Sequence, residues 1–216
     1  MGKMIIELQK DIVNPNIDIE TLLLKAYLIA KKLKLTDFEA WLNHELTGYP
    51  SDVVLPEYRE VIGIPVAFNS IEGWQIADEN MPRDLTALLY EVFSKFPMKH
   101  SISNIMSLIS SHGTTVDLML SPKLFSDMVL PNIEKISLRV GKNYLEEILS
   151  KIRKVLLDWT IELESNNILG EDFEFSLEER SRANEPEIKN YTVHIYGNNN
   201  QVQQETWNSE QSFQTE

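Results

Sequence analysis

The clearest helical pattern in the sequence is NYLEEILSKIRKVLLDWTIELESNN, residues 143–167. Its apolar residues recur every three or four positions, which is the spacing of one buried helical face. The stripe consists of Leu145, Ile148, Leu149, Ile152, Val155, Leu156, Trp159 and Leu163. Asn143 and Glu146 are an expected capping pair at its start, and Gly170 follows its expected end near Asn166. A helix of this length spans roughly 36 Å, so we expect it to be the spine of the folded part.

Two helices are expected near the N-terminus. The first covers Met4 to Val13 and stops at the Asn14-Pro15 pair, because proline disfavours helix in the residue before it. Asp18 is the expected cap of the second. The second helix has an apolar face made of Ile19, Leu22, Leu23, Ala26, Ile29, Ala30 and Leu33. Its spacing predicts one buried side.

A third helix is expected over Leu35 to Tyr49. Thr36 and Glu39 have the spacing of a capping box, and Gly48 suits the left-handed position after a helix end. Its apolar face is expected to contain Phe38, Trp41, Leu42 and Leu46. A tight turn joins it to the second helix, so the two are expected to form an antiparallel helical hairpin.

The middle of the chain changes to the composition of strands. β-branched and aromatic residues around turn residues predict two antiparallel strands, 58–68 and 73–77, with Pro65 at a bulge or an edge. Further strands are expected at 114–120 and 133–140. Helices are expected at 85–96, 102–110 and 122–129. The predicted fold class is α+β: the N-terminal helical hairpin and one long C-terminal helix pack on a small, mostly antiparallel sheet.

Composition excludes several classes of function. The chain has 216 residues, a net charge of −13, 43% hydrophobic residues and no cysteine. It therefore has no disulfide framework, thiol nucleophile or cysteine zinc site. The acidic balance argues against a broad basic face, so we expect no direct nucleic-acid partner. We find no signal peptide and no apolar run of ~20 residues, and therefore expect a cytoplasmic protein without membrane contact.

The acidic charge is concentrated at the C-terminal end, where composition also changes. Residues 171–216 hold ten acidic and three basic residues and are rich in Asn, Gln, Glu and Ser. We therefore expect one α+β domain over 1–180 and a linker over 181–190, which contains Ser181, Asn184 and Pro186. A β-hairpin or β-arch tail is expected over 191–204, and a disordered acidic end over 205–216.

Catalytic and metal-binding motifs are missing from the sequence. None of the histidines, His44, His100, His112 and His194, has a second ligand at a recognised metal spacing. Phosphate-loop, dinucleotide, zincin and nucleophile-elbow patterns do not occur. We therefore expect no catalytic residue, no metal and no cofactor. Three tryptophans, Trp41, Trp74 and Trp159, are interpreted as core anchors rather than stacking platforms.

The tail has a strand–turn–strand pattern with almost no charge. An isolated hairpin is marginal in water, so the segment docks on its own domain, pairs with another copy or stays disordered. Asn and Gln side chains form ladders when identical strands stack, as in the bacterial amyloid-type signalling motifs that the tail loosely resembles. The candidate residues for self-association are Tyr191, Val193, Ile195, Gly197, Asn198, Asn199 and Val202.

Most of the chain resembles the AbiTii domain family of bacterial abortive-infection proteins. The matching segments are LLLKAYLIA (22–30), FEAWLNHELTGYP (38–50), PEYR (56–59), Gly73-Trp74 and VLLDWTIELESNNILG (155–170). This resemblance covers roughly residues 1–180, and the group Trp41…Glu45…Gly48-Tyr49 is its most specific part. It implies antiphage defence or a toxin–antitoxin-like role, and it brings no catalytic residues with it. A Gly/Asn-rich β tail also commonly follows such domains.

Two classes of function remain open. The first is a non-enzymatic defence module that acts through protein–protein contacts as a homo-oligomer, with a phage protein or a co-encoded defence protein as a further partner. The second is a toxin-type hydrolase or nuclease whose site is built from scattered carboxylates such as Glu39, Glu45, Asp158 and Glu162. A third idea is an acidic inhibitor that mimics nucleic acid, which requires the acidic residues to line one face.

Overall fold

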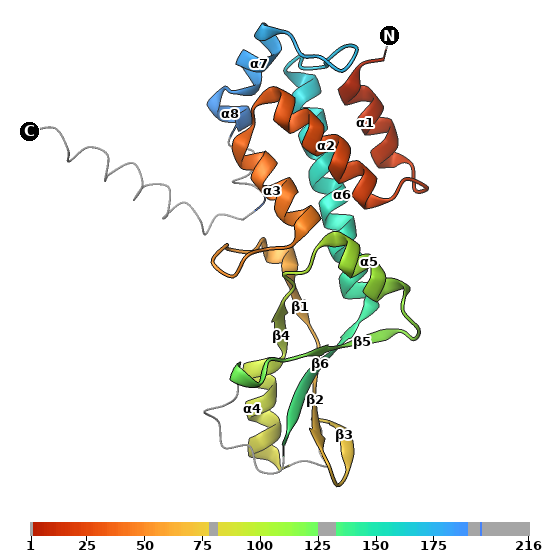
Figure 1. Ribbon diagram of the computed structural model, residues 1–216, viewed down its shortest axis with the longest axis vertical. Coiled ribbons are helices and arrows are strands. Elements are labelled where there is room, and N and C mark those ends of the chain that lie inside the picture. The colour runs from red at the N-terminus through yellow and green to blue at the C-terminus, as the bar shows by residue number, and fades with distance from the viewer. Residues whose placement is uncertain (1, 78–81, 125–132, 190–194, 196–216) are drawn as a thin grey trace, which may run out of the picture. The chain divides into compact units, whose positions relative to one another are not determined.

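The computed structural model describes residues 2–77, 82–124, 133–189 and 195, and it confirms the α+β class. Contacts divide the chain into two units, where we expected one domain over 1–180. Unit 1 comprises Met1–Glu57, Lys99–Ser103 and Leu149–Glu216, and unit 2 comprises Tyr58–Met98 and Asn104–Ile148. Figure 1 shows unit 1 as helices gathered beside the long helix α6 (Lys142–Ser165), and unit 2 as a sheet with a helix on it.

The first two helices of unit 1 agree with prediction. Helix α1 covers Met4–Val13 and α2 covers Ile19–Leu33. Asp18 is the N-cap of α2, and its carboxylate accepts a hydrogen bond from the Thr21 backbone N–H at 2.8 Å. All seven residues of the expected apolar face are buried. Arg153 of α6 donates to the backbone oxygens of Ile12 (2.6 Å), Asn14 (3.4 Å) and Ile17 (2.7 Å), and so neutralises the carbonyls at the end of α1.

Aromatic side chains of α3 and α6 fill the core of unit 1. Phe38 stacks on Trp159 with ring centroids 4.2 Å apart, and it contacts Trp41 at 5.0 Å. Both tryptophans are fully buried, which confirms them as core anchors. In the α6 stripe, only Leu149 and Val155 are partly rather than fully buried.

Helix α3 (Thr36–Thr47) is two residues shorter at its C-terminal end than expected, and its predicted capping box is wrong. Leu35 is the N-cap and makes no side-chain cap bond. The Glu39 carboxylate accepts instead from the Lys31 ammonium at 2.8 Å, because a charged donor forms a stronger bond than a backbone amide. Gly48 ends the helix with φ +97° and ψ 161°, a positive φ outside the left-handed helical region.

The segment 181–190, which we expected to be a linker, contains helical residues. Helix α7 covers Leu177–Ala183 and α8 covers Pro186–Lys189. A complete capping box of Ser176 and Glu179 starts α7. Asn184 donates from its amide to the backbone oxygen of Leu33 at 2.9 Å, so this segment is attached to the end of α2.

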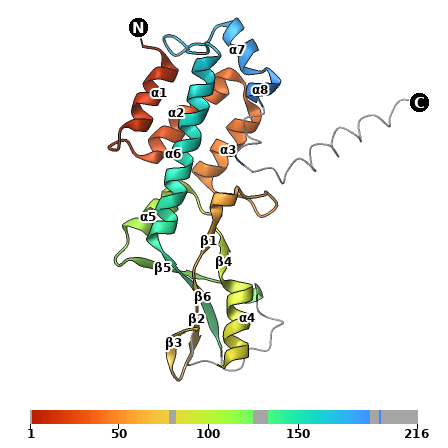
Figure 2. The same ribbon diagram turned by 180° about the vertical axis from the view of Figure 1, so that it is seen from behind.

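Unit 2 contains a four-stranded antiparallel sheet in the order β3-β2-β6-β5. The strands are β2 (Ile64–Asn69), β3 (Gly73–Ile76), β5 (Thr115–Met119) and β6 (Lys135–Gly141). Helix α4 (Arg83–Phe93) lies against one face of the sheet, as Figure 2 shows from behind. Its Leu89 and Phe93 form the core with Ala67 and Ile136. The bounds of β5 and β6 and of α5 (Ile102–Ser110) agree closely with prediction.

The expected strand over 58–68 is divided at Gly63. A short 3-10 helix (Glu57–Arg59) and β1 (Glu60–Ile62) come before it, and β2 comes after it. A Cβ at position 63 would lie 2.6 Å from the Arg139 backbone oxygen, so only glycine allows this approach. Pro65 was expected at an edge or a bulge, but β2 has neighbours on both sides. Because Pro65 has no backbone N–H, the ladder lacks one hydrogen bond near the start of β2.

The expected helix over 85–96 is corrected at both ends. Helix α4 begins at Arg83 and ends at Phe93, and β4 (Lys95–Pro97) pairs antiparallel with β1. Of the expected helix over 122–129, the structure describes a 3-10 turn at Pro122–Leu124, and the rest lies outside the described residues. Helix α6 begins at Lys142, one residue before the expected capping position. No helix among the described residues combines the length and apolarity of a membrane span.

Candidate functional site

Six of the seven tail residues proposed for self-association lie outside the described residues: Tyr191, Val193, Gly197, Asn198, Asn199 and Val202. The seventh, Ile195, has a helical backbone and a buried side chain. The helical backbone of Ile195 differs from the strand expected at this position. Self-association through the tail stays a prediction.

The four scattered carboxylates of the hydrolase hypothesis each have a separate partner. Glu39 bonds to Lys31, and Asp158 bonds to Lys154 at 2.5 Å on the surface of α6. Glu45 is fully buried and accepts from the Tyr49 hydroxyl at 2.7 Å. Glu162 accepts from the Asn166 side-chain amide at 3.0 Å. In the described part of the chain, no three His, Asp or Glu side chains are placed to hold a metal ion.

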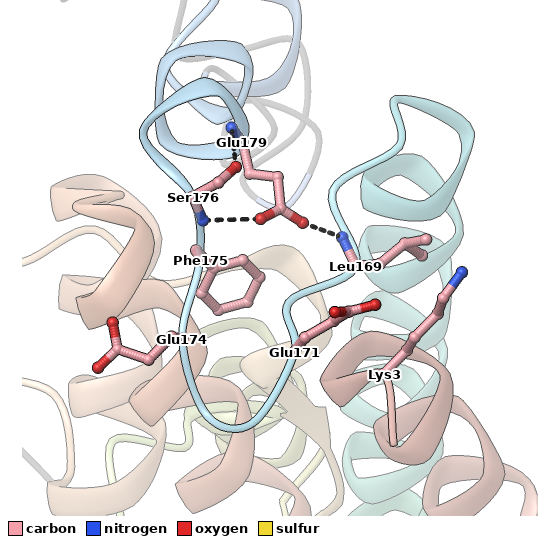
Figure 3. Close-up of a pocket in the computed structure, with 7 residues that line it drawn as sticks. All are labelled: Lys3, Leu169, Glu171, Glu174, Phe175, Ser176 and Glu179. Atoms are coloured by element: carbon pink, nitrogen blue, oxygen red, sulfur yellow. Dashed lines mark hydrogen bonds between the residues drawn. The ribbon is translucent and has the colours of Figure 1, made fainter. Parts of the chain in front are cut away.

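The loop after α6 is held by Glu179, as Figure 3 shows. One carboxylate oxygen accepts from the backbone N–H groups of Leu169 and Gly170, both at 2.9 Å, and the other accepts from Ser176 N–H at 2.8 Å. The carbonyls of the same loop accept from the first amides of α1: Met4 N–H bonds to Gly170 at 3.2 Å, and Ile5 N–H bonds to Leu169 at 3.1 Å. One carboxylate thus connects the end of α6, the start of α7 and the start of α1.

The electrostatics of Glu179 fit an anchor rather than a proton-transfer group. Burial raises the pKa of this carboxyl, but hydrogen bonds from the backbone N–H groups of Gly170, Ser176 and Leu169 together lower it by more than burial raises it. The pKa of Glu179 therefore lies below its ordinary value of 4.5. It is therefore ionised at neutral pH, and its oxygens are engaged by backbone donors. The adjoining pocket of about 450 Å³ is lined by Lys3, Leu169, Glu171, Glu174, Phe175, Ser176 and Glu179.

A tight turn between Glu171 and Glu174 places an aromatic side chain on the surface. The backbone N–H of each glutamate bonds to the carbonyl of the other, at 2.9 and 2.8 Å. Asp172 and Phe173 both have positive φ, 48° and 63°, which is costly for a bulky side chain. Phe173 is 66% exposed and borders a pocket of about 130 Å³. Its other lining residues are Met4, Glu7, Leu8, Asp11, Lys25, Leu28 and Ile29.

On the side away from α4, which we call the open face, the sheet of unit 2 has exposed apolar side chains among polar ones. Ala67 and Ile136 point to α4, so their strand neighbours point the other way. Its large exposed apolar side chains are Ile64, Trp74, Ile76 and Met119. Trp74 is 43% exposed and contacts Phe68 at 5.2 Å, which corrects its interpretation as a core anchor. An antiparallel sheet packed on one side usually has polar residues on the other.

Charged side chains on the open face are already paired or lie over an aromatic ring. Arg139 donates from two nitrogens to Asp117, both at 2.8 Å, and this hydrogen bonding holds the pKa of Asp117 below its ordinary value. Lys135 Nζ lies 5.3 Å from the centroid of the Phe68 ring. The Ser137 hydroxyl is buried without a hydrogen-bond partner among the described residues. The open face is therefore suited to an apolar protein surface more than to a strongly charged ligand.

Comparison with models of protein families identifies the family of the chain. The AbiTii model matches residues 3–188. The chain belongs to the AbiTii family. A search of curated proteins and a search of solved structures each gave no match. Membership of AbiTii indicates a role in abortive infection, that is, in antiphage defence.

The most specific AbiTii residues in this chain are structural. Trp41 is fully buried in the core, and the Glu45 carboxylate is buried against the Tyr49 hydroxyl. A Cβ at Gly48 would lie 3.0 Å from the Lys99 backbone oxygen. The resemblance in these residues therefore reports how AbiTii unit 1 folds, and it does not identify a catalytic site.

The open face of the AbiTii chain was missed at the sequence level. Trp74 and Ile76 alternate along β3, so the sequence contained the signal that they share a face. Their partners across the sheet, Phe68 and Val66, became known only from the register. Nothing in the sequence marked Phe173, because its exposure comes from the turn between Glu171 and Glu174.

Proposed function

We propose that this AbiTii chain acts in antiphage defence as a non-enzymatic protein-interaction module that assembles as a homo-oligomer. In this proposal the tail over 191–204 assists assembly. The open face of unit 2 binds a further protein, either a phage protein or a co-encoded defence protein. The open face is the observation that carries the proposal.

The open face supports protein binding through its composition. Four large apolar side chains are exposed on this one face, and exposed apolar side chains that gather on one face can mark an interaction site. Trp74 is the kind of residue that dominates binding energy at protein interfaces. The Arg139–Asp117 pair beside the apolar residues supplies a polar rim, which typical interfaces also have.

A phage-protection assay with full-length variants tests the proposal. The double variant Trp74→Ser/Ile76→Ser removes apolar side chains that are 43% and 41% exposed, so we expect a chain that still folds, as circular dichroism checks, and protection that falls at least tenfold. The matched control is Ile71→Ser, which changes a 90% exposed side chain at the tip of the β2–β3 turn. Protection that survives the double variant would count against the open face as the binding surface.

The role of the tail is tested by light scattering on the full-length chain. The variant Val193→Lys/Val202→Lys introduces charge into the neutral segment and leaves Ile195 in place. We expect a lower mass than for the native chain, because like charges oppose pairing of identical strands. Equal masses for the two proteins would remove the tail from the proposal.

The hydrolase alternative is separated from the proposal by a third variant. Asp158→Asn/Glu162→Gln removes two carboxylates of α6 and keeps the size of the side chains. Under the proposal this variant protects as well as the native chain. Loss of protection with an unchanged fold would favour the carboxylate-built enzyme.

A further inference from the structure

The outer side of α2 has two large apolar side chains where a solvated helix normally has polar ones. Leu24 is 54% exposed and Leu28 is 42% exposed. They are four residues apart and therefore lie on one ridge of the helix. The ridge begins with Glu20 and ends with Lys32. Neither of these charges has an ion-pair or hydrogen-bond partner among the residues that the structure describes.

The order of residues along this ridge is self-complementary. Leu24 and Leu28 lie at equal distances on either side of the midpoint of the ridge. Glu20 and Lys32 also lie at equal distances on either side of it. If a second α2 lies antiparallel across this midpoint, Leu24 meets Leu28 of the second copy. Glu20 then meets Lys32 of the second copy. An interface with a two-fold axis has this property, because residue i contacts j and j contacts i.

The surface beside the ridge has a hole that fits such an arrangement. The pocket of about 130 Å³ is lined on α2 by Lys25, Leu28 and Ile29, which are three of the four positions that surround a knob in helix packing. An apolar cavity of about 150 Å³ accommodates benzene, so this pocket suits one leucine side chain. Phe173 lines one side of it.

We propose that α2 with Phe173 is a two-fold interface between two copies of this chain. Leu24 of each copy enters the pocket of the other, and Glu20 of each copy pairs with Lys32 of the other. Antiparallel α2 helices also align their dipoles favourably. The inference deepens the proposed homo-oligomer and rests on it, but it assigns the contact to unit 1 rather than to the tail.

Charge exchange in the full-length chain tests the pairing. Glu20→Lys or Lys32→Glu alone places like charges opposite each other twice in each dimer. We expect the dimer Kd from sedimentation to rise at least tenfold, and the effect to shrink at 1 M salt. The double variant Glu20→Lys/Lys32→Glu restores opposite charges and is expected to return the Kd to within about threefold of native. Lys151→Glu, an exposed charge reversal on α6, is the control.

A disulfide cross-link gives an independent readout of the antiparallel register. The native chain has no cysteine, so Glu20→Cys/Lys32→Cys introduces the only two. These positions are roughly 18 Å apart along α2, which is too far for a bond within one chain. Oxidation is therefore expected to give a covalent dimer, whereas Glu20→Cys alone gives none. A covalent dimer that forms equally well with Glu20→Cys alone would overturn the antiparallel register.

The outcomes separate this inference from the tail-assisted assembly. A native mass above monomer that falls with Leu24→Ser but not with the tail variant supports the α2 interface and refutes tail assistance. A mass that falls with the tail variant and is unchanged by the charge exchanges overturns the α2 interface. A native chain that stays monomeric at high micromolar concentration refutes both.

Discussion

Replacing Glu179 by glutamine removes the charge that holds the loop between α6 and α7. The carboxylate accepts three backbone N–H groups at 2.8–2.9 Å. Glutamine has one oxygen for the amides of Leu169 and Gly170, and its NH2 group then faces the N–H of Ser176. The variant thus weakens two bonds and replaces the third with a contact between two donors.

The magnitude follows from these three bonds. A hydrogen bond to a charged group contributes about 1.5–3 kcal/mol, and a neutral bond contributes about 0.5–1.5 kcal/mol. Because Glu179 is only partly buried, water compensates some of the loss. We expect the free energy of opening this loop to fall by about 2–4 kcal/mol, which is a factor of about 30 to 1,000 in the opening equilibrium.

The effect depends on pH with a definite sign. The pKa of Glu179 is lowered in the folded chain, although burial opposes the lowering by the backbone N–H groups. Its stabilisation is therefore fully present above the unfolded pKa and is lost as pH falls from about 4.5 towards the folded pKa. The difference between the native chain and Glu179→Gln should accordingly shrink below pH 4.5.

Amide hydrogen exchange measures the loop directly. The amides of Leu169, Gly170 and Ser176 should exchange about 30 to 1,000 times faster in Glu179→Gln at neutral pH. Glu178→Gln, a neighbouring exposed residue on the same helix, is the matched control. Equal exchange in the two variants would show that the Glu179 carboxylate does not hold the loop, and so would a difference that persists unchanged at pH 3.

Three further changes test other parts of the fold. Arg153→Leu leaves the carbonyls around the end of α1 without their charged donor, and we expect urea denaturation to show a loss of about 2–4 kcal/mol that Lys151→Leu does not show. Gly63→Ala forces a Cβ against the Arg139 carbonyl and should cost about 1–3 kcal/mol, with faster amide exchange in β6; unchanged exchange there would contradict the close approach. Phe173→Gly relieves the positive φ and should raise the free energy of unfolding by about 1 kcal/mol. Weaker self-association should accompany this gain, and a destabilised Phe173→Gly would show that the turn is unstrained.

Local patterns predicted the N-terminal helices well. The apolar period of α2 and the cap at Asp18 depend on residues within one or two turns, so the sequence contains all the information. The same holds for the buried stripe of α6, where Trp159 and Leu163 lie in the core as expected.

Distant contacts account for the errors. Lys95 and Phe96 were expected to end a helix, but pairing with β1 makes Lys95–Pro97 a strand. The division at Gly63 depends on the backbone of β6, which approaches from more than 70 residues away in sequence. Glu39 was expected to cap α3, yet Lys31 on α2 provides a stronger partner. Such competition between partners is decided only when the chain is folded.

The candidate surfaces were predicted less well than the fold. The open face depends on strand register, since Trp74 becomes part of a patch only through its neighbours Phe68 and Ile76. Phe173 depends on two positive φ angles that its residue type does not favour. Family membership could be predicted from the sequence because its most specific residues, such as Trp41, form the core.

The hydrogen bonds between the start of α1 and the loop at Leu169 and Gly170 have a consequence for biosynthesis. The first helix emerges early from the ribosome, but the carbonyls that complete its first turn are translated more than 160 residues later. Unit 2 lies between these two parts in the sequence, and its last residue is translated before Leu169 and Gly170. Unit 1 can therefore be completed only after Gly170 has been translated, and a nascent chain that stops before Gly170 leaves the first amides of α1 without these acceptors, so it is a substrate for chaperones and proteases.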